Sequence, residues 1–246
     1  MKPLYDEIGK AYVATRRTDP RIADQLHAEL AGATKIINIG AGAGSYEPEG
    51  IDLIAVEPST KMIAQRPKEA HPVVKASAEA LPFEDNSFSH ALTILSIHHW
   101  QDQTRGFREI NRVTTHKFIA LTWDPTAEPF WLTRDYFPEG YAMDLKIFSP
   151  LEYFDDHFEE VKVTPLLIPH DCQDGFLAAY WKRPQAYLDP VVRQSISTFA
   201  KLDDVTEGLQ KLETDLNSGA WADRNQDLLE QSELDAGYRI VTAKVR

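Results

Sequence analysis

A glycine-rich turn between two short apolar runs constrains this chain more than any other stretch. The first run, residues 36–39, leads into the alternating glycines of Gly40–Gly44, and the second run, residues 51–56, ends at Glu57. Glycine tolerates positive φ angles and lets the backbone approach a ligand closely, because it has no Cβ. An acidic residue about 20 positions after such a loop begins is the usual partner of a ribose diol in α/β folds. The pattern predicts a strand, a turn and a second strand around a nucleotide-like ligand.

The spacing of these glycines differs from that of the dinucleotide fingerprint. That fingerprint, G-x-G-x-x-G, opens a full helix whose N-terminus binds a pyrophosphate. Here the glycines read G-x-G-x-G, and residues 45–50 leave room for about one helical turn. The loop also has no basic residue. These features suit a ligand with a ribose and no pyrophosphate, such as S-adenosylmethionine, while a purely structural tight turn is the alternative.

Composition narrows the class of protein. The 246 residues are 43% apolar and 26% charged, which is ordinary for a globular chain, and the net charge of −12 argues against binding to DNA. The single cysteine, Cys172, excludes an intramolecular disulfide and a thiolate metal cluster, and we expect no metal. There is no N-terminal signal-like run and no apolar run near 18 residues. We therefore expect a cytoplasmic protein without a membrane span, and the oligomeric state stays open.

Strand and helix patterns alternate through the first half of the chain. Asp19 and Pro20 read as the start of a helix that ends before Gly32, and Ser59 starts a second, short helix. The apolar periodicity of residues 103–112 predicts a third helix. Further strands are expected at residues 72–76, 90–96 and 117–123. Strands separated by helices predict an α/β fold, a doubly wound parallel sheet whose ligands bind at the carboxyl ends of the strands.

The second half reads as a helical lid with two returning strands. Aromatic residues are dense from residue 130 to 141, and Ser149–Glu152 has the form of a capping box for a helix ending near Phe158. Helices are expected at three places, 174–182, 189–202 and 205–217, and strands at 161–168 and 238–245. We expect an N-terminal lid segment, 1–32, and one domain, 33–246, with cap insertions at about 125–158 and 174–230.

Four motifs, in order, resemble the class I S-adenosylmethionine-dependent methyltransferases. The resemblance covers roughly residues 5–123 and is to the small-molecule branch that includes the trans-aconitate and menaquinone-type enzymes. It is carried by Ile37–Gly44, Val56–Ser59 with Met62, Ala78–Phe83 with Ser87–Phe88, and His98–Trp100 with Glu109–Val113. The resemblance implies a Rossmann-like, seven-stranded, mostly parallel sheet with an antiparallel last strand, formed by residues 238–245.

The resemblance also assigns cofactor-binding residues. It implies that the glycine loop holds the methionine part of S-adenosylmethionine, that Glu57 holds the ribose and that the Ser77–Ala78 turn holds the adenine. Met62 packs on the adenine or belongs to the core, and Arg16 pairs with the cofactor carboxylate or lies on a solvated surface. The expected cofactor contacts are Arg16, Asn38, Gly40, Ala41, Gly42, Gly44, Glu57, Met62, Ser77, Ala78 and Ser96.

Two positions depart from the family pattern. The family often carries an acid where this chain has Asn38 and another where it has Ser77. Asparagine still offers a hydrogen-bond acceptor, although it lacks the charge, and a hydroxyl is a weaker acceptor for the adenine amino group than a carboxylate. Either change is expected to weaken cofactor binding without changing the class.

The motif after the fourth strand supplies candidate catalytic residues. Histidine has a pKa suited to a general base, so His98 or His99 can take a proton from the acceptor. On a strand their side chains point to opposite sides, so at most one of them, with His98 favoured, is expected to face the crevice. A structural or substrate-contacting histidine is the alternative. Aromatic side chains expected to line the acceptor pocket, or simply to pack in core and lid, are Tyr12, Trp100, Trp123 and Trp131.

The leading hypothesis is a methyltransferase that acts on the oxygen, nitrogen or carbon atom of a small, partly apolar metabolite. One alternative is a methyltransferase of a carrier-bound acyl group, although the many acidic residues of the lid disfavour a docking carrier. Another is a protein that binds S-adenosylmethionine with weak or no catalysis, which the changes at Asn38 and Ser77 leave open.

Overall fold

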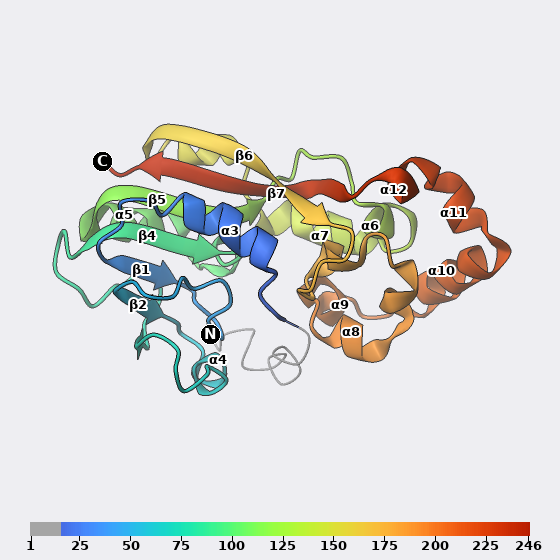
Figure 1. Cartoon of the computed structure of the whole chain (residues 1–246), viewed down its shortest axis with the longest axis horizontal. Coiled ribbons are helices and arrows are strands. Elements are labelled where there is room, and N and C mark those ends of the chain that lie inside the picture. The colour runs from blue at the N-terminus through green and yellow to red at the C-terminus, as the bar shows by residue number, and fades with distance from the viewer. Residues whose placement is uncertain (1–15) are drawn as a thin grey trace.

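A computed structural model describes residues 16–246, and a seven-stranded sheet forms its centre (Figure 1). The strand order is β3-β2-β1-β4-β5-β7-β6; β1 to β5 are parallel, and β7 is antiparallel to both β5 and β6. The strands are β1 (Ile36–Ile39), β2 (Leu53–Val56), β3 (Val73–Val74), β4 (Phe88–Ile94), β5 (Thr114–Trp123), β6 (Glu159–Pro169) and β7 (Glu233–Lys244). The predicted α/β fold and its antiparallel last strand are confirmed.

The three helices predicted in the first half are present. They are α3 (Pro20–Ala28), α4 (Thr60–Ala64) and α5 (Gln103–Val113). The Asp19 carboxylate accepts from the backbone N–H of Arg21, and the Ser59 hydroxyl accepts from that of Met62, so both expected N-caps are formed. Figure 1 shows α3 and α5 on opposite faces of the sheet.

Each face of the sheet has its own apolar core. Under α5, Phe107 lies against Phe118 and Phe158, with ring centroids 6.1 and 5.3 Å away. Under α3, Leu26 is fully buried in a second cluster that continues into the lid, where Trp181 is also fully buried. Because the lid shares this second core with the sheet, the two pack as one body.

Short helices gather at the carboxyl ends of the parallel strands and form the lid (Figure 1). They are α6 (Trp131–Asp135), α7 (Pro138–Ile147), η3 (Leu177–Tyr180), η4 (Pro184–Leu188), α8 (Pro190–Gln194), α9 (Ser197–Lys201), α10 (Thr206–Ser218), α11 (Ala220–Arg224) and α12 (Gln226–Glu230). Gly219, at φ 84°, ends α10 as its sequence suggested.

Three lid helices are shorter than predicted. Residues 149–158 form only the 3-10 helix η2 (Leu151–Phe154), because the Ser149 hydroxyl donates to Gln103 Oε1 at 2.8 Å instead of capping. The expected helix at 189–202 is broken into α8 and α9, where the Ser195 hydroxyl bonds back to the carbonyl of Val192. Residues 174–182 contain only η3, since the Asp174 carboxylate is used in long-range contacts described below.

The first cap insertion is also shorter than the expected segment 125–158. Phe154 and Phe158 lie beneath α5 in the core of the sheet, with their rings 5.5 and 5.3 Å from that of Phe107. Only α6 and α7 of this segment stand in the lid. Residues 1–15 of the expected N-terminal lid segment, 1–32, lie outside the described residues, and the rest of it contains α3.

Candidate functional site

The glycine loop is held open by hydrogen bonds to the second strand. The carboxylate of Glu57, which is 6% exposed, accepts from the backbone N–H of Gly42 with one oxygen and from that of Ser59 with the other, both at 2.8 Å. The amides of Gly40 and Ala41 both donate to the carbonyl of Val56. The expected ribose ligand therefore also fixes the shape of the loop.

The three glycines of the loop are required for different physical reasons. Gly40, Gly42 and Gly44 all have positive φ angles, of 69°, 54° and 94°. A Cβ on Gly40 would lie 1.7 Å from the Ser96 hydroxyl, whereas one on Gly42 would meet only the end of Met62, at 3.4 Å. Close packing against the turn after β4 explains Gly40, and backbone conformation explains the other two.

Asn38 lies in a buried polar network beside the loop. Its amide donates to Glu47 Oε1 at 3.0 Å, and the other oxygen of Glu47 pairs with Arg66 at 2.7 Å. The oxygen of Asn38 is buried and has no hydrogen-bond partner among residues 16–246. Glu47, a residue that the sequence did not single out, thus places a carboxylate beside Asn38, and its charge is balanced by Arg66.

The remaining predicted cofactor residues fall into two groups. Met62 and Ala78 are buried, at 2% and 5% exposure, and the Ser77 carbonyl closes the following turn by accepting from the amide of Ala80. Ser96 accepts a hydrogen bond from the Trp100 indole at 3.1 Å. The Trp100 ring stands over Gly106, whose added Cβ would be 2.5 Å from it, so Trp100 packs between α5 and the loop.

Arg16 occupies a buried ion pair at the junction of the loop and the lid. Its Nε lies 2.7 Å from Asp174, whose side chain is fully buried. The Tyr46 hydroxyl donates to the same carboxylate at 2.8 Å, and Tyr46 lies two residues after the last glycine of the loop. Arg16 also lines the pocket described next, so its expected contact with a cofactor carboxylate remains a prediction.

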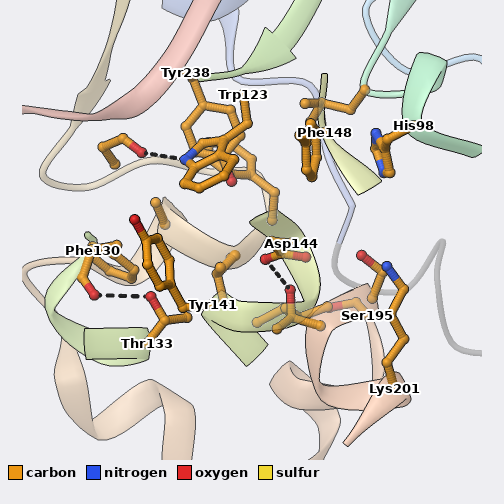
Figure 2. A pocket seen from close by; sticks show the side chains of 18 of the residues that line it. His98, Trp123, Phe130, Thr133, Tyr141, Asp144, Phe148, Ser195, Lys201 and Tyr238 are labelled. Carbon is orange, nitrogen blue, oxygen red and sulfur yellow. Dashed lines mark hydrogen bonds between the residues drawn. The ribbon is translucent and has the colours of Figure 1, made fainter. Parts of the chain in front are cut away.

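An aromatic pocket of roughly 800 Å³, including its solvent-open part, lies between the sheet and the lid (Figure 2). Its aromatic walls are formed by Trp123, Phe130, Tyr141, Phe148, Phe176 and Tyr238, and its polar side chains are those of Arg16, His98, Thr133, Asp144, Ser195, Ser197, Thr198 and Lys201. Trp123 was predicted to line this pocket; its indole donates to the carbonyl of Ala236 at 3.1 Å.

The other three predicted pocket residues lie elsewhere or outside the described residues. Trp100 packs between α5 and the glycine loop, as described above. Trp131 is 3% exposed in the lid core, donates to the carbonyl of Trp181 and packs against Trp221 at 5.2 Å. The expectation that it lines the pocket is therefore corrected in favour of the packing alternative. Tyr12 lies outside residues 16–246.

The two histidines do not alternate as on a strand. β4 ends at Ile94, Leu95 has a φ of 48°, and residues 97–99 form the 3-10 helix η1. The two imidazole rings consequently lie side by side, with centroids 3.9 Å apart. His98 lines the aromatic pocket and stacks on Phe148 at 4.1 Å. The strand geometry expected here was wrong, because the strand ends before the motif begins.

Both histidines are neutral near pH 7. Burial lowers the pKa of His98 well below its usual value, with smaller contributions from His99 and Lys201, and burial lowers the pKa of His99 to about 4. The Nδ1 atom of His98 is buried without a hydrogen-bond partner in the part of the chain that the structure describes. A neutral ring with an unsatisfied nitrogen can accept a proton or a hydrogen bond from a ligand.

The sequence did not single out Asp144, Phe148 or Lys201 as pocket residues. Each is an ordinary residue in a helical stretch without a recognisable motif, and only the dense aromatics nearby indicated a pocket. Among residues 16–246, no helix is long and apolar enough to cross a membrane, and no group of three or more histidine, cysteine or acidic side chains is arranged around a metal position.

Known proteins resemble both the loop region and the whole chain. The family described as "Methyltransferase domain" matches residues 37–117. Two curated rice relatives, chloroplastic 2-methyl-6-phytyl-1,4-hydroquinone methyltransferases 2 and 1, are 28% and 26% identical over 52% of this chain. The matched regions cover 40% and 42% of those relatives, so the chain spans well under half of their length.

Solved structures extend the likeness into the lid. A structure from Anabaena variabilis, named as a methyltransferase from an antibiotic biosynthesis pathway, is 34% identical and superposes with a TM-score of 0.86 over 93% of this chain and 98% of its own. A Thermotoga maritima methyltransferase, 19% identical over 99% of this chain and 96% of its own, shares the fold with a TM-score of 0.58. With its strand order and glycine loop, this chain belongs to the class I S-adenosylmethionine-dependent methyltransferases.

Proposed function

We propose that this protein transfers the methyl group of S-adenosylmethionine to a small, largely apolar acceptor bound in the aromatic pocket. One observation carries the proposal. Leu95 and His98 line the pocket. The side chain of Ser96, which lies between them in the chain, occupies the space that a Cβ on Gly40 of the glycine loop would need. A single turn of chain therefore touches both the loop and the pocket, so ligands in the two places would lie next to each other.

The residues around the loop fit the cofactor. A carboxylate has acceptor sites for about four hydrogen bonds, so Glu57 can hold two backbone amides and still receive ribose hydroxyls. The oxygen of Asn38, which has no partner among the described residues, is an acceptor of the kind that the cofactor's ammonium group needs. Met62, Ser77 and Ala78 would border the adenine. S-adenosylmethionine supplies the electrophilic methyl group.

The chain's own contribution is to position the acceptor and to accept its proton. Holding two reactants in line supplies a large share of the rate enhancement in a displacement of this kind. His98 is neutral at pH 7, and its Nδ1 lacks a partner among the described residues, so it can accept the proton of an acceptor, although its lowered pKa makes it a weaker base than an exposed histidine. The pocket's aromatic walls favour an apolar body.

Two narrower alternatives remain as competing proposals. A protein that binds the cofactor without catalysis is suggested by the missing charge at Asn38, since the neighbouring Glu47 carboxylate is already paired with Arg66. Methylation of a carrier-bound acyl group would need a carrier to dock, and the chain's net charge of −12 makes an acidic carrier a poor partner.

Calorimetry and a turnover screen test the proposal. We expect S-adenosylmethionine and S-adenosylhomocysteine to bind, and mass spectrometry to detect methylated products from a panel of small aromatic and aliphatic metabolites. His98→Gln should lower kcat by about 100-fold without changing cofactor affinity, whereas the exposed His116→Gln should change neither. If millimolar cofactor gives no binding heat and no thermal shift, the proposal is wrong. Binding without turnover would favour the binding protein.

A further inference from the structure

The lid side of the aromatic pocket carries one carboxylate and one ammonium group. Asp144 stands on α7 and Lys201 on α9, and both line the pocket. Figure 2 shows them on the lid side, across from His98 and Phe148 on the sheet side. We call Asp144 and Lys201 the lid polar pair.

The lid polar pair has few partners in the described part of the protein. Within residues 16–246, the carboxylate of Asp144 accepts only one hydrogen bond, a long one of 3.4 Å from the hydroxyl of Thr198. Asp144 and Lys201 influence each other electrostatically, yet they form no direct ion pair among the described side chains. A space therefore separates two opposite charges that face one pocket.

Keeping these charges in the pocket is costly. Burial raises the pKa of Asp144 to about 6, and burial lowers the pKa of Lys201, despite the attraction between them. A partly buried charge without good hydrogen bonds destabilises the folded protein. Charged groups that a fold retains in a cleft despite this cost are frequently ligand contacts.

We propose that Asp144 and Lys201 determine acceptor specificity by holding a neutral hydroxyl group of the acceptor, which donates to the carboxylate and accepts from the ammonium. The inference rests on the proposed function and names the class of its acceptor. That class is an apolar, ring-bearing compound with a hydroxyl group at the end away from His98.

A hydroxyl fits the lid polar pair better than a charged group does. It is both a donor and an acceptor, so it can satisfy Asp144 and Lys201 together. An acceptor with an ammonium group would meet Asp144 but be repelled by Lys201, and one with a carboxylate would have the opposite difficulty. A purely apolar end would leave both buried charges without partners.

The position of the pair, across the pocket from His98, fits a specificity role, although the charge of Lys201 also helps to lower the pKa of His98. The chain turn that touches the glycine loop contributes His98 to the sheet side of the pocket. The lid polar pair comes from helices on the other side (Figure 2). The ring of the acceptor would therefore lie between the methyl group and the hydroxyl, against Phe148 and Trp123, whose rings are 5.4 Å apart.

Four phenyl compounds with one body and different ends test this inference: 2-phenylethanol, phenethylamine, phenylacetate and ethylbenzene. Their binding to the protein saturated with S-adenosylhomocysteine is measured by ligand-detected NMR. We expect 2-phenylethanol to bind about 10-fold or more tightly than each of the others, because charged hydrogen bonds are each worth more than neutral ones.

Variants of Asp144 and Lys201 test whether these residues cause the tighter binding of 2-phenylethanol. Asp144→Leu and Lys201→Met should each abolish the advantage of 2-phenylethanol over ethylbenzene, and Asp144→Asn should reduce it. The double variant should lose little more than either single one, since both residues hold one hydroxyl. The exposed residues Glu139 and Lys146 of α7 give matched controls, Glu139→Gln and Lys146→Met, which should keep the preference.

The outcomes separate this inference from the proposed function. If S-adenosylhomocysteine binds but the four compounds bind equally, bind not at all, or rank with a charged end first, the inference is wrong and the proposed function stands. A preference for 2-phenylethanol that survives in Asp144→Leu and Lys201→Met also overturns it. If S-adenosylhomocysteine does not bind, the proposed function itself fails, and the inference with it.

Discussion

The glycine-loop region and the aromatic pocket differ in how fully their polar side chains are hydrogen-bonded. In the loop region, the Glu57 carboxylate accepts two short backbone hydrogen bonds, and Glu47 is paired with Arg66 and Asn38. In the pocket, Asp144 receives one long hydrogen bond, and the Nδ1 atom of His98 has no partner in the described part of the chain. The loop is assembled before a ligand arrives, whereas the pocket has polar groups that a ligand would complete.

This difference coincides with the boundary between the part of the chain that matches the family and the lid that follows it. The family match ends at residue 117, before the lid begins, and covers the loop, Glu57 and the turn after β4. The pocket residues Asp144 and Lys201 come from α7 and α9. A common cofactor calls for a fixed cradle, and a particular acceptor calls for its own partners. The predictions below test whether the two regions can be separated.

The largest effect is expected at the junction of the two regions, where Asp174 binds Arg16 and Tyr46. Asp174→Asn removes one charge from a buried ion pair and should lower the free energy of unfolding by about 3–5 kcal/mol. Urea unfolding measures this loss. Asp171→Asn, in an exposed pair with Arg21, should have a far smaller effect. If Asp174→Asn gives two transitions instead of one, the lid and sheet do not unfold together.

Glu57→Ala should affect the loop region alone. Removing the carboxylate takes away the proposed ribose contact and both loop anchors, so the affinity for S-adenosylhomocysteine should fall by about 100-fold in calorimetry. The exposed Glu49→Ala is the control. Unchanged cofactor affinity in Glu57→Ala would mean that the ribose is held by another residue.

Asp144→Asn should make the protein more stable while weakening the proposed acceptor contact. The pKa of Asp144 is raised to about 6 in the folded protein, so the folded state binds the proton more tightly, and stability falls as the pH rises from about 4 to about 6. At pH 7, Asp144→Asn should therefore raise the free energy of unfolding by about 2 kcal/mol. At pH 4 this gain should largely vanish. Charged groups facing Asp144 include Lys201, and Tyr238 is another titratable neighbour.

If Asp144→Asn raises the free energy of unfolding equally at pH 7 and at pH 4, the ionised carboxylate of Asp144 does not destabilise the folded protein. That result would also remove one support for the lid polar pair as a binding site, because a group kept at a cost to stability is typical of functional sites.

Phe148→Ala is expected to have the smallest effect and to concern the pocket alone. The Phe148 ring contacts His98 and Trp123. Its loss should lower the affinities for 2-phenylethanol and for ethylbenzene equally, by about 10-fold, and leave cofactor affinity unchanged. NMR titration and calorimetry measure the two. Leu145→Ala, which is exposed on α7, is the control. If only the affinity for 2-phenylethanol falls, Phe148 lies beside the hydroxyl group of the ligand and not beside its ring.

The sheet was predictable because its signals are local. Apolar runs, the caps at Asp19 and Ser59, and the glycine spacing each act over a few residues, and the structure confirms the elements they predicted. The lid was harder, because its helices are set by contacts between distant residues. Ser149 bonds to Gln103 rather than capping its own helix, and Asp174 bonds to Arg16 and Tyr46.

The site divides in the same way. The loop and Glu57 could be found from motif spacing, and so could the position of the two histidines, although not their 3-10 geometry. Asp144 and Lys201 are single charged residues 57 positions apart, and nothing local shows that they face one pocket. Trp131 looked similar to Trp123 in sequence, but only the fold shows that Trp131 lies in the lid core and Trp123 in the pocket wall.

A crystal structure with S-adenosylhomocysteine bound would test most directly whether a fixed cradle and a separate acceptor pocket meet at the turn after β4. We predict the ribose hydroxyls on the carboxylate of Glu57, the adenine beside Met62 and Ala78, and the sulfur facing the aromatic pocket near His98. The loop, residues 40–44, should move little, because its hydrogen bonds are already formed. S-adenosylhomocysteine bound inside the aromatic pocket instead of at the glycine loop, or bound at the loop with its sulfur pointing away from the pocket, would contradict this account.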